Sequence, residues 1–126
     1  MKGYAIILAI ILLILIVGVG ALRFLSTTAE ALLEDLDAVG GSIEAGDWAA
    51  ARGSLERLQR RWDEVKGVWA VFIPHGEIDL VEESLAKLAA AVESENMTLA
   101  RSELAGVMFL IRHIPENEVP RLSNIL

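Results

Sequence analysis

The chain has 126 residues, enough for one small domain, and 54% of them are apolar. It contains no cysteine, which excludes disulfides, thiolate metal sites and a cysteine nucleophile. The net charge of −7 argues against a protein that follows nucleic-acid phosphates, so we expect proteins and not nucleic acids as partners.

The amino-terminal residues 3–22 include no charged side chain. As a helix rising about 1.5 Å per residue, a segment of this length matches a hydrocarbon core of about 30 Å. We therefore predict an uncleaved transmembrane anchor over residues 1–22, which contacts the lipid bilayer through residues 3–22, and a helical bundle domain over residues 23–126. A cleaved signal peptide is the alternative, because Lys2 supplies a short positive end. However, no small-x-small cleavage site is well spaced, and the apolar run is longer than usual.

The charges on either side of this segment predict its orientation. Lys2 precedes the segment, whereas Arg23 is followed by four acidic residues, Glu30, Glu34, Asp35 and Asp37. Positive charge favours the inner side of a membrane. The predicted topology is single-pass, with the amino terminus inside and the bundle at the outer face of the cell membrane.

Four helices are predicted by apolar residues that recur at steps of three and four. Their expected ranges are about 23–45, 47–73, 77–94 and 96–114. The first continues the membrane helix and has its apolar stripe at Leu22, Leu25, Ala29, Leu32, Leu36, Val39 and Ile43. A break at Gly40 and Gly41 is the open question here, since an interior glycine costs about 1 kcal/mol relative to alanine and a pair can end or kink a helix.

The second helix has the longest apolar stripe, formed by Trp48, Ala51, Leu55, Leu58, Trp62, Val65, Trp69 and Phe72. Such a stripe is typical of a packed core, and a platform for stacking a ligand is the less favoured alternative. The opposite side is charged and carries Arg52, Glu56, Arg57, Arg60, Arg61 and Glu64. Its Glu–Arg pairs four residues apart indicate a solvated face, while a basic patch for lipid headgroups or an acidic partner is the alternative.

Prolines are expected to end the second and fourth helices, at Pro74 and Pro115. The third helix has its stripe at Ile78, Val81, Leu85, Leu88 and Val92. The fourth is capped by Asn96 and has its stripe at Met97, Ala100, Leu104, Val107, Ile111 and Ile114. The residues after Pro115 are too few for another full helix, although Leu122, Ile125 and Leu126 are placed to dock back on the bundle.

Two stretches of the chain, Ile43–Leu58 and Val92–Val107, form a weak internal repeat. Asp47 aligns with Asn96, Arg52 with Arg101 and Leu55 with Leu104. Each copy comprises a helix end, a capped turn and the start of the next helix, so the chain encodes two hairpins similar to tetratricopeptide hairpins. Because a solenoid needs about three repeats, we predict an all-α fold in which the membrane helix continues into an antiparallel four-helix bundle.

Several stretches together resemble a bacterial protein family, namely GDWAAARGSLERLQRRW, VWAVFIPHGEID, LARSEL, IRHIPE and the terminal SNIL. The family is the domain-of-unknown-function family 4363. The resemblance implies a small single-pass bacterial membrane protein with a helical soluble part. It implies no activity, substrate or binding residue.

The HGEID stretch is the only constellation with ligand chemistry. His75, Glu77 and Asp79 offer an imidazole and two carboxylates, and His113 comes near if the bundle closes that way. Alternate residues at a helix start do not share a face, and carboxylates in a first turn are favoured by the helix dipole. We therefore expect a structural turn at the junction of the hairpins, without a catalytic, metal or cofactor site.

Two functions follow from these features. The favoured one is a membrane-anchored interaction or scaffold module, not an enzyme, that engages another envelope or membrane protein. The alternative is a metal-dependent enzyme or metal sensor that uses the turn containing His75, Glu77 and Asp79. Convergence of these three residues and His113 around a cleft would support the alternative.

Overall fold

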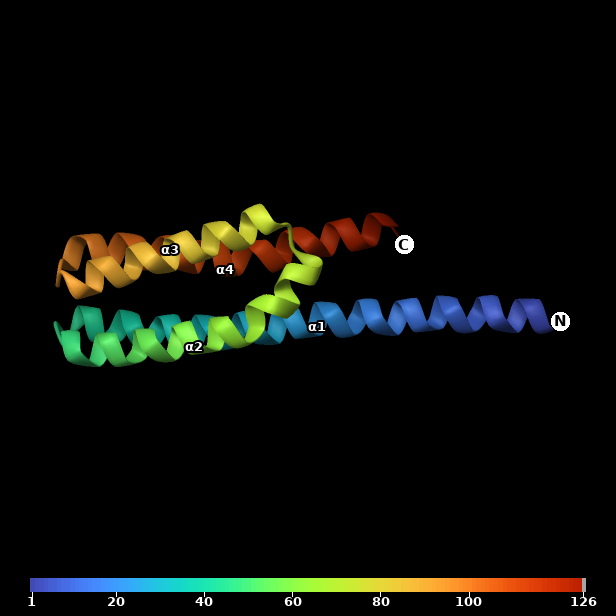
Figure 1. The fold of residues 1–126 in the computed structure, drawn as a ribbon, viewed down its shortest axis with the longest axis horizontal. Helices are drawn as coiled ribbons and strands as arrows, with labels where there is room; N and C mark the ends of the chain where they lie inside the picture. The colour runs from blue at the N-terminus through green and yellow to red at the C-terminus, as the bar shows by residue number, and fades with distance from the viewer. Residues whose placement is uncertain (126) are drawn as a thin grey trace.

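The computed structural model describes the backbone of residues 1–125 and the side chains of residues 1–116. Its four helices are α1 (Lys2–Glu44), α2 (Trp48–Phe72), α3 (His75–Glu93) and α4 (Met97–Ile125). Successive helices run in opposite directions and form two hairpins, α1–α2 and α3–α4 (Figure 1). Helix α1 packs on α2 and α4, and α3 packs on α4 and α2. The predicted all-α, antiparallel four-helix bundle is confirmed.

Helix α1 is continuous from the apolar segment into the bundle, so the break considered at Gly40 and Gly41 does not occur. Gly40 instead permits close packing of α1 against α4. A Cβ atom added at Gly40 would lie 3.0 Å from Cδ2 of Leu104, whereas one added at Gly41 would meet nothing within 4 Å. The loss of helix propensity at Gly40 is therefore compensated by a close approach of two helices.

This difference predicts unequal responses to alanine at the two glycines. Gly41→Ala should raise the free energy of unfolding by about 0.5–1 kcal/mol, because alanine is the better helix former. Gly40→Ala should show a smaller gain or a loss, because Leu104 must move to accommodate the new methyl group. Urea unfolding of the two variants measures the difference, and equal gains would contradict the close approach.

The apolar stripes form one core, with three adjustments to the prediction. Phe72 is exposed and Ile73 is buried in its place, because the chain leaves helical geometry at Ile73. Trp48, Val65, Met97 and Leu104 pack against the core but remain partly buried. At the start of the bundle, Ala21 is buried while Leu22 is half-buried. The stripe of α3 is buried throughout.

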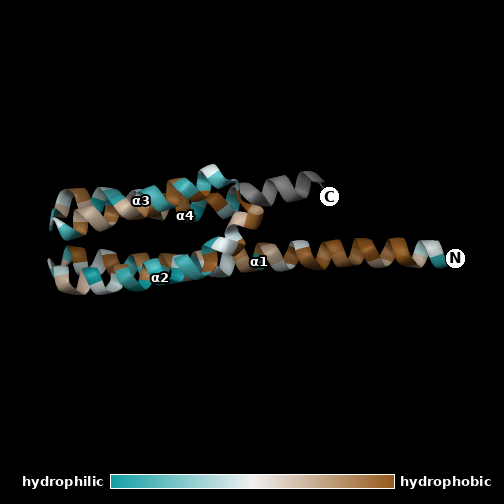
Figure 2. Cartoon of the chain, viewed as in Figure 1, coloured by the Kyte–Doolittle hydropathy of each residue, from teal (hydrophilic) through white to brown (hydrophobic). Residues whose placement is uncertain are grey.

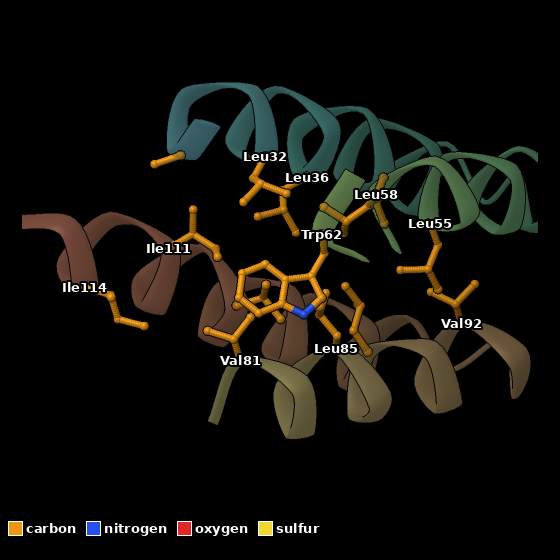
Figure 3. Packing of buried hydrophobic residues seen from close by; sticks show 14 of the residues in the cluster. Leu32, Leu36, Leu55, Leu58, Trp62, Val81, Leu85, Val92, Ile111 and Ile114 are labelled. Atoms are coloured by element: carbon orange, nitrogen blue, oxygen red, sulfur yellow. The ribbon is translucent and has the colours of Figure 1, made fainter. Parts of the chain in front are cut away.

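Two tryptophans lie at the centre of this core. Trp62 is 3% exposed and Trp69 is fully buried, and their rings meet edge to face at a centroid distance of 5.5 Å. Figure 3 shows the Trp62 indole directed between the helices toward Val81 and Leu85. Trp69 Nε1 donates a hydrogen bond to Thr28 Oγ1 of α1 at 2.8 Å. The predicted core role of both residues is thus observed, and Trp48 lies at its margin.

The helix ends follow the prolines only in part. Pro74 separates α2 from α3, and Ile73 before it is extended, with φ −115° and ψ 134°. Helix α3 begins at His75, two residues before the predicted start.

Helix α4 continues past Pro115 to Ile125, so the prediction that Pro115 ends it is wrong. A helix passes through a proline when the hydrogen bond lost at that position is outweighed by the rest of the helix and its packing. The predicted docking of Leu122, Ile125 and Leu126 lies outside the described side chains.

The two hairpin turns have equivalent geometry. Asp47 Oδ1 accepts a hydrogen bond from Ala50 N at 3.1 Å, and Asn96 Oδ1 accepts one from Leu99 N at 3.0 Å. The residue before each cap, Gly46 or Glu95, has a positive φ, of 67° and 54° respectively. The repeated sequence therefore encodes the same capped turn twice. The similarity of the hairpins to tetratricopeptide repeats is not confirmed and stays a prediction.

Candidate functional site

The apolar half of α1 leaves the bundle as a single rod (Figure 2). From Met1 to Gly20 every residue is exposed except the half-buried Gly18. Of the described helices, only α1 is long and apolar enough to cross a membrane. A surface this large and apolar on a water-soluble protein would need a cover. A lipid bilayer has the thickness and chemistry to provide one.

A groove between α2 and α3 is the second candidate. It consists of two adjoining hollows of about 260 Å³ and 180 Å³ that share Gln59. The first is lined by Gln59, Trp62, Asp63, Lys66, Glu82, Leu85 and Ala86, and the second by Arg52, Leu55, Glu56, Gln59, Ala89, Val92 and Glu93. We call these residues together the α2–α3 groove. Helices α2 and α3 are the least extensively packed of the four principal pairs, which leaves this hollow open.

Charged side chains surround the apolar base of the groove. Glu82 Oε1 lies 3.1 Å from Lys66 Nζ and 3.4 Å from Trp62 Nε1. The hydrogen bond from Lys66 to Glu82, followed by the one to Asp63, raises the pKa of the Lys66 ammonium. The groove thus combines a base of buried apolar groups with a charged rim.

Two arginines connect the hairpins by ion pairs at the end of the bundle far from the apolar rod. Arg101 of α4 binds Glu44 of α1 through two nitrogens, at 2.6 Å and 2.7 Å. Arg52 of α2 donates to Glu95 Oε1 in the second turn at 3.0 Å and also lies 3.5 Å from Glu93 of α3. The arginines align in the internal repeat, and so do the glutamates. Each hairpin therefore contributes an arginine that pairs with the equivalent glutamate of the other hairpin. This reciprocal pairing relates the two hairpins by an approximate twofold axis.

The Glu44–Arg101 pair predicts a loss of stability in acid. The hydrogen bond from Arg101 lowers the pKa of the Glu44 carboxyl. The ion pair therefore contributes to the free energy of unfolding at any pH above the pKa that Glu44 has in the unfolded chain. This contribution is lost as the pH falls through the lower pKa that Glu44 has in the folded chain. Urea unfolding as a function of pH should show Glu44→Gln less stable than the native chain at neutral pH, with the gap closing in acid. Glu34→Gln, on the exposed side of α1, is the control, and a gap independent of pH would contradict the pairing.

The residues of the HGEID turn do not converge. His75 and Asp79 are exposed and Glu77 is half-buried in the first turn of α3. His113 stacks on Phe109 of its own helix, with ring centroids 4.0 Å apart, and its Nδ1 lies 2.9 Å from the Phe109 carbonyl oxygen. Within the described residues, no three His, Asp or Glu side chains are grouped to hold a metal ion. The geometry that would support a metal-dependent function is not found there.

The sequence predicted the long apolar helix, the tryptophan core and the capped turns, but it did not predict the α2–α3 groove. The groove depends on the spacing between two hairpins, and periodicity within one helix carries no such information. The reciprocal ion pairs did have a signal, because the arginine and the glutamate of each pair recur at the offset of the repeat.

The family relationship agrees with this structure. The family described as Domain of unknown function (DUF4363) matches residues 19–125. The chain belongs to this family. The matched residues cover the bundle and begin near the end of the apolar rod. No curated protein and no solved structure matches the chain.

Proposed function

We propose that this DUF4363 protein is a membrane-anchored interaction module. Residues 3–22 hold it in the bilayer, and the bundle stands at the outer face of a bacterial cell membrane, where it binds another envelope protein. The observation that carries the proposal is the uninterrupted helix α1, half of it an exposed apolar rod and half of it a core helix of the bundle. Such a helix couples the position of the bundle to the membrane without a flexible linker.

The α2–α3 groove is the proposed contact surface. Trp62 and Leu85, both buried, close its base, and Lys66, Asp63 and Glu82 provide a charged rim that a partner can reach. These features suit a partner helix whose charged side chains pair with the rim. We propose contact, not turnover, as the mode of action, and no described group of residues favours the metal-dependent alternative.

Site-specific crosslinking in the native membrane tests this proposal. A photoreactive amino acid at Gln59, where the two hollows meet, should give a discrete crosslinked product containing one envelope protein. The matched control is the same amino acid at Asp37, on the exposed side of α1, which should give no such product. Equal products from both positions, or none from Gln59, would remove the groove as the contact surface.

A further inference from the structure

The end of α2 carries an exposed apolar patch. Val68, Val71 and Phe72 are 42%, 75% and 36% exposed, and their spacing of three and four places them on one side of the helix. This end of α2 lies where the apolar half of α1 leaves the bundle, and there the chain crosses toward α3 (Figure 1). Nothing in the described part of the chain covers the patch, so its position relative to the membrane determines what can cover it.

The register of α1 and α2 gives that position. Trp69 Nε1 bonds to Thr28 Oγ1, and the two helices are antiparallel, so Phe72 lies about level with Leu25. Leu25 is three residues beyond Leu22, the last residue of the uncharged segment, which corresponds to about 4.5 Å along the helix axis. The headgroup layer on each side of the hydrocarbon core is about 5–7 Å thick. When the uncharged segment fills the core, the patch therefore lies within the headgroup layer.

Charge does not explain an attraction of this region to lipid. The charged groups around it include Lys66 of α2, Arg23 of α1 just outside the uncharged segment, and Glu77 and Asp79 in the first turns of α3. Two cations and two carboxylates balance, so an anionic membrane surface gains no net attraction from them. Burial of apolar side chains at the headgroup boundary is favourable in free energy in any bilayer, including a zwitterionic one.

We propose that the end of α2 docks on the bilayer surface, with Val71 and Phe72 inserted in the headgroup layer as a second membrane contact beside the transmembrane helix. This inference rests on the proposed membrane anchor. The two contacts hold the bundle upright, because one helix alone permits tilting. They also keep the α2–α3 groove clear of the lipid and open to a partner.

Depth-dependent fluorescence quenching in the intact chain tests the docking. The chain has no cysteine, so Val71→Cys, Ala49→Cys and Leu12→Cys each give one site for an environment-sensitive fluorophore. All three positions are exposed, and Ala49 lies at the far end of α2. The proteins are reconstituted in phosphatidylcholine vesicles that contain lipids with a quencher near the headgroup or deep in the acyl chain.

The expected result has three parts. The fluorophore at position 71 is quenched most by the shallow quencher, the one at position 12 by the deep quencher, and the one at position 49 by neither. An unquenched fluorophore at position 71 beside a quenched one at position 12 would overturn the docking and leave the anchor intact. Equal quenching at positions 71 and 49 would also overturn it, since the bundle would then lie flat. An unquenched fluorophore at position 12 would overturn the anchor itself and the docking with it.

Discussion

Trp69→Ala is expected to lower the free energy of unfolding by about 3–5 kcal/mol, the cost of removing a fully buried aromatic side chain. Trp69 is not accessible to solvent and packs against the ring of Trp62. The substitution also removes the hydrogen bond to Thr28, which joins α2 to α1. Urea unfolding of the full chain in a non-ionic detergent, followed by circular dichroism, measures the loss.

Phe72→Ala provides the control for this measurement. Phe72 also belongs to the apolar stripe predicted from the sequence, but it is 36% exposed in the structure, so its removal should cost clearly less than the removal of Trp69. Comparable losses from Trp69→Ala and Phe72→Ala would mean that the described core is wrong. A full loss from Trp69→Ala alone would agree with it.

Replacement of both Leu12 and Leu13 by arginine is expected to release the protein from the membrane. Each exchange of leucine for arginine near the centre of a span costs about 3–4 kcal/mol of insertion free energy, so two exceed what one apolar segment supplies. The side chains at these positions are exposed and do not contact the bundle, so the bundle should stay folded. The fraction of protein that resists an alkaline wash of the membranes measures the effect.

Leu12→Ile with Leu13→Ile is the matched control, because isoleucine preserves the hydropathy of the segment. It should stay in the membrane as the native chain does. Retention of the double arginine variant at the native level would show that the segment is not held by lipid.

Local patterns predicted much of this molecule because the signals are local. The spacing of apolar residues located all four helices, and Asp47 and Asn96 located the turns, since a cap acts within a few residues of itself. Local preference left one question open and gave one wrong answer. Gly40 and Gly41 are poor helix formers, which left a break possible, and α1 continues through them with α4 packed closely against Gly40. The predicted stop at Pro115 was wrong, because α4 passes Pro115 despite its missing amide proton.

The candidate site was less predictable than the fold. Its residues come from two hairpins, and neither Lys66 with Glu82 nor Trp62 with Leu85 is close in sequence. Phe72, one residue of the apolar patch at the end of α2, was predicted as core because it continues the stripe, while the structure exposes it next to the proline turn. An apolar stripe shows which side of a helix is buried, but it does not show how far along that helix its partner helices extend.

The most direct test of the membrane-anchored account is the mass of the protein in cells of its native host, separated into washed membranes, soluble fraction and medium. The account predicts the complete chain, with its amino-terminal segment, in the alkali-washed membranes. A shortened chain that starts near Leu22 or Arg23 and appears in the medium would contradict it and identify the apolar segment as a cleaved signal peptide.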